Sequence, residues 1–88
     1  MNNAITTAEI VKAALALHSG RKAERCMLRH VRPMLGSTKQ AQDAALLQAQ
    51  REGAIVLYRE DNTPALIKAD HEAVLEIAGC ARHLLYVM

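Results

Sequence analysis

The sequence predicts an α+β domain in which three N-terminal helices precede a two-stranded antiparallel hairpin. Three segments before Gly53 repeat their apolar residues at intervals of three and four, the period of an amphipathic helix. After Gly53 the pattern changes to short apolar runs rich in β-formers. The final run, "RHLLYVM", matches the first one, "AIVLYR", in length and character. We therefore expect these two runs to pair with each other.

Length and composition limit the possible function classes. The chain has 88 residues, enough for one domain with one core. Apolar residues make up 51%, but sixteen of them are alanine and neither Phe nor Trp is present, which predicts a thin core of closely packed helices. The net charge of +2 is too small to indicate nucleic-acid binding by itself. No apolar run approaches the roughly 18 residues of a membrane span, and the N-terminal pattern differs from that of a signal peptide. Two cysteines fit a reducing compartment. We therefore expect a cytoplasmic protein.

The first helix is predicted over residues 7–18. Thr6 and Glu9 have the spacing of a capping box, in which two side chains satisfy backbone amides at the start of a helix. Gly20 is placed to end the helix, because glycine adopts the left-handed conformation without steric cost. The expected apolar face consists of Ile10, Val11, Ala14, Leu15 and Leu17.

The second helix is predicted over residues 21–31, ending near Arg32 because the residue before Pro33 disfavours helical angles. One side of this helix is apolar. The opposite side carries the densest basic feature of the chain, Arg21, Arg25, Arg29 and Arg32. One interpretation is a solvated face whose arginine stems cover Leu28. The other is that these guanidiniums bind phosphates or an acidic partner, since arginine has forked donors that match phosphate oxygens.

The third helix is predicted between Ser37, spaced from Gln40 as a second capping box, and the stop signal Gly53. Its apolar face is rich in alanine and shallow. Leu47 projects into the polar side instead, so it either packs under the strands or belongs to a protein contact surface.

The run "AIVLYR" predicts the first strand, and the turn signal "EDNTP" follows it. A tight hairpin back through "ALIKA" is one possible partner. The C-terminal "RHLLYVM" is the better one, because its alternating apolar residues match those of the first strand. The long connection between them contains "KADHEAVLEIAG", which predicts a short helix capped by Asp70.

Three helices followed by an antiparallel strand pair is the order of a winged helix-turn-helix domain. The segments "DAALLQAQREGAIVLYREDN" and "KADHEAVLEIAGCARHLLYVM" resemble a winged-helix module of bacterial proteins. In that module a third helix ending in glycine runs into a strand, a loop with a short Asp-capped helix follows, and a Gly-x-x-Arg-His-leucine-tyrosine strand closes the domain. The resemblance covers about half of the chain, from Asp43 onward. The chain departs from the pattern at Gln42, where the module has a large apolar residue, and at Pro33.

The resemblance implies binding of double-stranded DNA, with the first half of the third helix in the major groove and the wing on the backbone. Lys39 and Gln40 have side chains that can bind guanine or adenine edges, with Asp43 beside them. Glu60 and Asp61 in the expected wing oppose this function, because they repel phosphate. The candidate DNA-binding residues are Arg25, Arg29, Arg32, Thr38, Lys39 and Gln40.

Motifs for catalysis or metal binding are weak. Cys26 and His30 lie four residues apart, and Cys80 and His83 lie three apart, so a zinc site with two cysteines and two histidines can be drawn. The long spacing between the pairs and the absence of a CxxC motif favour ordinary structural residues. Asp70 and the adjacent histidine have no plausible nucleophile beside them, and the four glycines are dispersed. We expect no enzymatic activity, metal, cofactor or small-molecule substrate.

Two functions from different classes remain. The first is a small DNA-binding regulator, expected to be a dimer because one winged helix makes a small footprint. The second is a protein-interaction or dimerisation module, such as an adaptor or a subunit of a bacterial or phage-encoded assembly. The candidate partner-binding residues of this second function are Leu47, Val56, Tyr58 and Tyr86.

Overall fold

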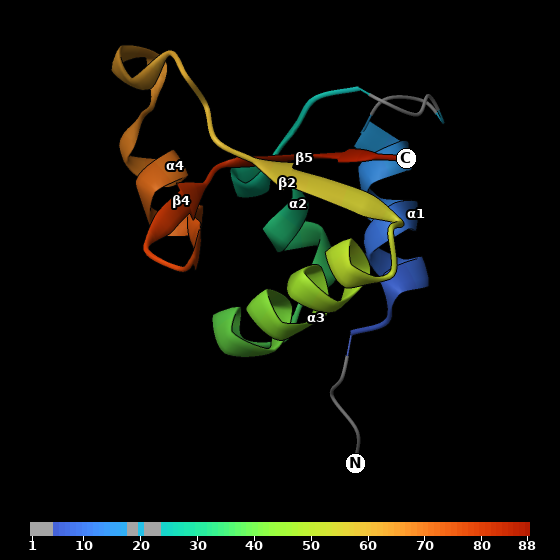
Figure 1. The fold of residues 1–88 in the computed structure, drawn as a ribbon. Helices are drawn as coiled ribbons and strands as arrows, with labels where there is room; N and C mark the ends of the chain where they lie inside the picture. The colour runs from blue at the N-terminus through green and yellow to red at the C-terminus, as the bar shows by residue number, and fades with distance from the viewer. Residues whose placement is uncertain (1–4, 18–19, 21–23) are drawn as a thin grey trace.

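The computed structural model describes residues 5–17, 20 and 24–88, and these confirm the α+β class (Figure 1). No helix among these residues is long and apolar enough to cross a bilayer. In chain order the elements are α1 (Thr7–Leu17), β1 (Cys26–Met27), α2 (Leu28–Leu35), α3 (Lys39–Arg51), β2 (Ile55–Tyr58), the 3-10 helix η1 (Thr63–Ala65), α4 (Lys68–Ala73), β3 (Leu75–Ile77), β4 (Cys80–Arg82) and β5 (Leu84–Val87).

The C-terminal strand β5 is the centre of an antiparallel sheet with the order β1-β5-β2. Val56 pairs with Tyr86 and Leu57 with Leu85, so the predicted pairing of the two matching runs is confirmed. The tight hairpin through "ALIKA" is wrong, because that segment ends η1 and leads into α4. On its other edge, β5 pairs with β1, where Cys26 lies opposite Leu85.

The core lies between one face of this sheet and the helices, and Figure 1 shows α2 and α3 on the same side of β2 and β5. Leu28, Leu46, Ile55 and Leu85 are at most 1% exposed. Full burial of such a side chain contributes on the order of 1.5–3 kcal/mol. Alanines from α1 and α3 fill the rest of the helical contact, which agrees with the thin core that the composition predicts.

The ends of α1 and α3 follow local signals. Thr6 Oγ1 accepts a hydrogen bond from the Glu9 amide (3.1 Å), and the Gly20 amide donates to the Leu15 carbonyl (2.7 Å) with a φ of 84° at Gly20. The end predicted at His18 lies outside the described residues. The predicted cap at Ser37 is wrong by one position: Thr38 Oγ1 accepts from the Ala41 amide at 3.1 Å.

The second helix differs from its prediction at both ends. Residues 26–27 form β1 because the free edge of β5 pairs with them, so α2 begins only at Leu28. The helix also continues through Pro33 to Leu35. Arg32, the residue before the proline, is held in place by hydrogen bonds of its side chain to Ala73 and Gln42. The predicted arginine face does not exist as one helix face: Arg25 precedes β1, and Arg21 lies outside the described residues.

The connection between β2 and β5 contains the predicted short helix, α4, and also a hairpin that the sequence did not indicate. Asp70 caps α4 from the third residue of the helix and not from the N-cap position: its Oδ2 accepts a hydrogen bond from the Ile67 amide at 3.0 Å. The expected closing strand consists of two strands, β4 and β5, separated by His83. Strand β3 pairs with β4 across Ala78 and Gly79, whose positive φ angles of 52° and 80° suit a two-residue hairpin turn.

Candidate nucleic-acid interface

Helices α2 and α3 are joined by a three-residue turn. Helix α2 ends at Leu35, the turn contains Gly36, Ser37 and Thr38, and α3 begins at Lys39. Gly36 and Ser37 both have positive φ, 67° and 64°. Glycine adopts this conformation without strain, so Gly36 allows the chain to reverse sharply between the two helices. Two helices joined by a short glycine-containing turn form the helix-turn-helix unit, in which many DNA-binding proteins place the second helix in the major groove.

The first turn of α3 faces solvent. Thr38, Lys39 and Gln40 are all exposed. The hydroxyl of Thr38 is already used as the helix cap. The Lys39 ammonium lies 3.8 Å from the Asp43 carboxylate one turn later. Unpaired amides at the start of a helix carry partial positive charge, so this end of α3 is suited to an anion.

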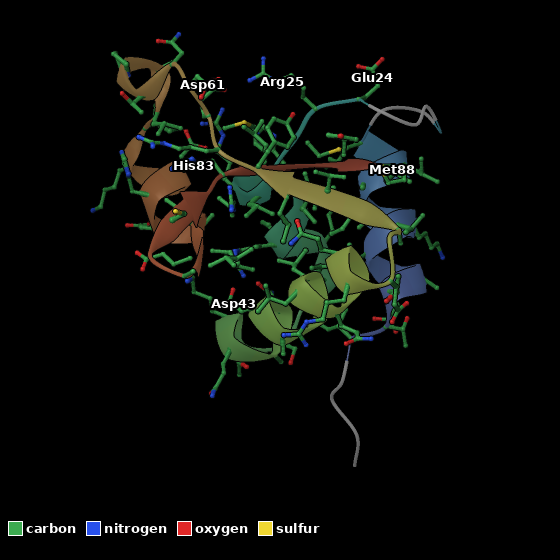
Figure 2. All side chains as sticks on the ribbon, in the orientation of Figure 1. Glu24, Arg25, Asp43, Asp61, His83 and Met88 are labelled. Atoms are coloured by element: carbon green, nitrogen blue, oxygen red, sulfur yellow. The ribbon has the colours of Figure 1, made fainter. Side chains whose placement is uncertain are left out.

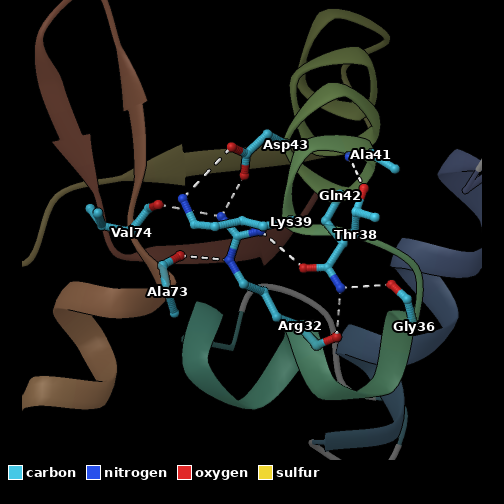
Figure 3. A network of polar contacts seen from close by, with 9 residues as sticks. All are labelled: Arg32, Gly36, Thr38, Lys39, Ala41, Gln42, Asp43, Ala73 and Val74. Atoms are coloured by element: carbon cyan, nitrogen blue, oxygen red, sulfur yellow. Dashed lines mark hydrogen bonds and ion pairs between the residues drawn. The ribbon is translucent and has the colours of Figure 1, made fainter.

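Arg32 is the centre of a buried polar network behind this turn (Figure 3). The residue is only 8% exposed. Its Nε donates to the Ala73 carbonyl (2.6 Å), one Nη donates to Gln42 Oε1 (3.0 Å), and the other donates to Asp43 Oδ1 (2.6 Å). These contacts connect α2 with both α3 and α4. The guanidinium predicted to hold phosphate is thus committed to positioning the helices.

Gln42 completes the same network and explains one departure from the winged-helix pattern. Its Nε2 donates to the carbonyls of Arg32 (3.2 Å) and Gly36 (2.7 Å). A large apolar side chain at this buried position would leave both carbonyls and the Arg32 donor without this partner. Gln42 therefore ties the turn to α3, and sequence reasoning missed this role. The signal available was a polar residue three and four positions before the apolar Ala45 and Leu46, on the apolar face of the third helix.

Arg29 and Arg25 lie in different surroundings. Arg29 forms an ion pair with Asp70 at 2.6 Å, in which the arginine side chain is 25% exposed and the aspartate side chain 1% exposed. Arg25 forms an ion pair with Glu60. Figure 2 shows Arg25 and Asp43 on opposite sides of the sheet. The structure thus places Arg29 beside α4 near Arg32, and it separates Arg25 from the first turn of α3.

The acidic residues expected to oppose DNA binding are also separated from α3. Glu60 is ion-paired with Arg25, and Figure 2 shows Asp61 on the same side of the sheet as Arg25. The hairpin that lies beside the first turns of α3 is β3–β4, which follows Val74 (Figure 3). The Val74 carbonyl lies 3.4 Å from an Arg32 Nη. Glu60 and Asp61 therefore do not belong to this side of the molecule.

Three of the four candidate partner-binding residues share one surface. Val56, Tyr58 and Tyr86 are half-buried on the sheet face turned away from the core, where the two tyrosine rings lie 5.5 Å apart between centroids. Leu47 does not join them, because it packs against the core from α3. Of the two interpretations of Leu47, the structure supports packing.

The four residues of the possible zinc site differ in their surroundings. Cys26 is buried with its Sγ 3.6 Å from the Ala14 carbonyl, and burial raises the pKa of its thiol. Cys80 is exposed. Within the ranges that the structure describes, no group of three or more His, Cys, Asp or Glu side chains could hold a metal ion.

His83 connects the sheet to the β2–α4 connection. Its Nδ1 accepts a hydrogen bond from the Glu60 amide (3.2 Å), its amide donates to the Tyr58 carbonyl (3.0 Å), and its carbonyl accepts from the Leu28 amide (3.0 Å). The side chain is buried, and this burial, followed by the nearby His71, lowers the pKa of His83 below its usual value of 6.5. A proton on Nδ1 would also remove the acceptor of the Glu60 amide.

We expect the protein to lose stability as the pH falls below about 6.5. Because the folded pKa of His83 is lowered, the unfolded chain binds more protons in this range, so stability is present above the unfolded pKa and is lost as the pH falls through the folded pKa. Urea unfolding between about pH 8 and pH 5 measures this slope. His83→Gln should flatten it and the control His30→Gln, at an exposed site, should not. An equal slope in wild type and His83→Gln would contradict the assignment.

Comparisons of this chain with protein-family models, with curated proteins and with solved structures found no match.

Proposed function

We propose that this protein is a winged helix-turn-helix protein that binds double-stranded DNA through the first turn of α3. The observation that carries the proposal is the three-residue turn between α2 and α3, which leaves the N-terminal turn of α3 exposed. In helix-turn-helix proteins the second helix of this unit enters the major groove with its N-terminal residues on the base edges. Lys39 and Gln40 occupy those positions here.

The arrangement around the two helices also supports a winged-helix fold. Three helices are followed by the antiparallel pair β2–β5, in the order expected for such a domain. The hairpin β3–β4 lies beside the first turns of α3 and is the segment that would act as the wing (Figure 3). Its turn consists of small residues, Ala78 and Gly79, which allow a close approach to a sugar-phosphate backbone.

The charges near α3 favour an anionic partner more than the sequence suggested. Asp43, the acidic residue in the first half of α3, is paired with Arg32 at 2.6 Å. Lys39 and the amides at the start of α3 then supply positive charge. Gln40 can form a bidentate contact with adenine, and the partly exposed Arg29 lies at the edge of the same side. Few phosphate contacts are available, so affinity for random duplex is expected to be low and to fall only with a shallow slope as salt increases, because each contact adds about 0.9 to that slope.

A salt titration with fluorescently labelled random duplex tests the proposal. We expect binding at about 50 mM salt, with an affinity that falls as salt increases. Lys39→Ala should weaken binding and reduce the slope of log affinity against log salt by about one. The matched control is Lys68→Ala, which removes the same charge from the exposed start of α4. No binding at about 50 mM salt, or equal losses in the two variants, would overturn the proposal.

A second candidate function is binding of a protein partner through the outer sheet face. The observation that favours it is the pair of neighbouring tyrosines with Val56, residues that lie outside the core cluster. Tyrosine is enriched at protein interfaces because it combines apolar area with a polar tip. Under this alternative, Tyr86→Ser would abolish partner binding, and the wild-type chain would not bind duplex DNA at low salt.

A further inference from the structure

Helix α1 is apolar on almost every side. Among its eleven residues, "TAEIVKAALAL", only Glu9 and Lys12 carry charge. Ile10, Ala13 and Ala14 face the core and are at most 6% exposed. A helix that is apolar all round is normally buried all round. The side of α1 that faces away from the core is therefore expected to have a partner.

The outward side is formed by Ala8, which is exposed, and by Val11 and Leu15, which are half-buried and also pack against the core at the border of this side. With Lys12, Ala16 and Gly20 they line a shallow hollow of about 520 Å³. A second hollow of about 260 Å³ adjoins it, shares Lys12 and Ala16, and extends to Met34 at the end of α2. Met34 is 47% exposed. We call Ala8, Val11, Lys12, Leu15, Ala16 and Met34 the α1 face.

We propose that the α1 face binds a second copy of this chain, with the two α1 helices packed antiparallel about a two-fold axis near Val11 and Lys12. The small side chains of Ala8 and Ala16 allow the helix axes to approach closely. A two-fold axis makes the interface isologous, so each copy presents the same surface to the other. In this arrangement Ala8 of one copy lies opposite Leu15 of its partner.

The charges of α1 favour this occupant over others. With the two-fold axis at residues 11–12, Lys12 of one copy lies opposite position 11 of the other copy. Glu9 of that other copy is two residues away, about 3 Å along the helix axis. Glu9 and Lys12 project from the same flank of α1, and an antiparallel two-fold axis keeps that flank on the same side in both copies. Two symmetric Glu9–Lys12 contacts result. A parallel pair would place these flanks on opposite sides and form neither contact.

Neither charge is used within the rest of the fold: the residues that the structure describes contain no ion pair of Glu9 or Lys12. An acidic or a basic partner would meet one like charge on the α1 face. A second copy meets opposite charges at both contacts, so the face is complementary to itself.

The size of the α1 face sets the expected strength. An eleven-residue helix is about 16 Å long, and a standard interface buries about 800 Å² per partner. A surface this short predicts a reversible dimer with a micromolar dissociation constant. Figure 1 shows α1 on the side of the molecule away from the first turns of α3. Both copies therefore keep α3 available, and the inference holds whether or not the chain binds DNA.

Sedimentation of the full chain from about 1 to 500 µM, a range that brackets a micromolar dissociation constant, should show a concentration-dependent dimer. Glu9→Lys alone makes both contacts lysine against lysine, and Lys12→Glu alone makes both glutamate against glutamate. Each variant should therefore dimerise about tenfold more weakly than wild type. An equimolar mixture of the two should recover the association, because each contact then joins one lysine with one glutamate.

The controls separate loss of the interface from loss of fold. Lys68→Glu makes the same charge change on α4, where the side chain is 90% exposed, and should leave the dimer unchanged. Ala8→Arg, at an exposed position, should abolish dimerisation without lowering the melting temperature. A wild-type chain that stays monomeric throughout the range, or a mixture that associates no better than either variant alone, would overturn the proposal.

Discussion

Arg32→Met is expected to destabilise the protein by about 2–4 kcal/mol. Methionine keeps the unbranched apolar stem of arginine but is shorter and has no donor for the Ala73 carbonyl, Gln42 Oε1 or Asp43 Oδ1. Each buried acceptor left unpaired costs about 1–3 kcal/mol, although Asp43, 34% exposed as a side chain, recovers part of its hydration. The loss is a large part of the roughly 4–13 kcal/mol expected for a domain of this length.

Urea denaturation measures this loss, and two further variants show its origin. Lys39→Met removes the other cation near Asp43 from an exposed site and should cost less than about 1 kcal/mol. Combining Arg32→Met with Gln42→Leu should cost less than the sum of the two single variants, because either single variant already breaks the hydrogen bond between these two side chains. If Arg32→Met and Lys39→Met cost the same, the network does not hold the helices together.

Removal of residues 83–88 is expected to abolish cooperative folding altogether. These residues contain all of β5, the central strand, which pairs with β1 on one edge and with β2 on the other. Leu84, Leu85 and Val87 are buried, and each contributes on the order of 1.5–3 kcal/mol. Without β5, neither of its neighbours has a partner in the sheet, and the core loses one wall.

Thermal melts followed by far-UV circular dichroism test this expectation. The matched control removes only Met88, which is 61% exposed, and should retain a cooperative melt. The point variant Leu85→Ala, at a fully buried site, should cost about 2–5 kcal/mol while keeping the fold. A chain lacking residues 83–88 that still melts cooperatively would show that β5 is dispensable.

The parts of the fold that were predicted correctly depend on local signals or on matched patterns. Thr6 and Gly20 mark the start and end of α1, and Gly53, with a φ of 78°, ends α3. These signals act within a few residues, so they can be identified in the sequence. The pairing of β2 with β5 was predicted over a long separation because the two runs match in length and in their apolar, β-forming residues.

The parts that were missed depend on partners far away in the chain. Strand β1 contains only Cys26 and Met27, too few residues to show a period, and it forms because β5 has a second edge. Pro33 predicted a helix end, but Arg32 is held by acceptors ten to forty-one residues away. The grouping of Arg25 with Arg29 assumed one continuous helix, and the strand between them separates the two residues.

The sequence by itself determined the α+β class, the start of α1, the end of α3 and the partner of β2, because each follows from side-chain periodicity and backbone preferences. The tertiary structure alone decided what the polar residues do. Arg32 and Gln42 are buried together, Glu60 is paired with Arg25, and the hairpin β3–β4 lies beside α3. The reason is physical. A charged residue has the same neighbours in the sequence whether its side chain is solvated or buried in a hydrogen-bond network, and only the positions of distant partners in the fold decide between these two states.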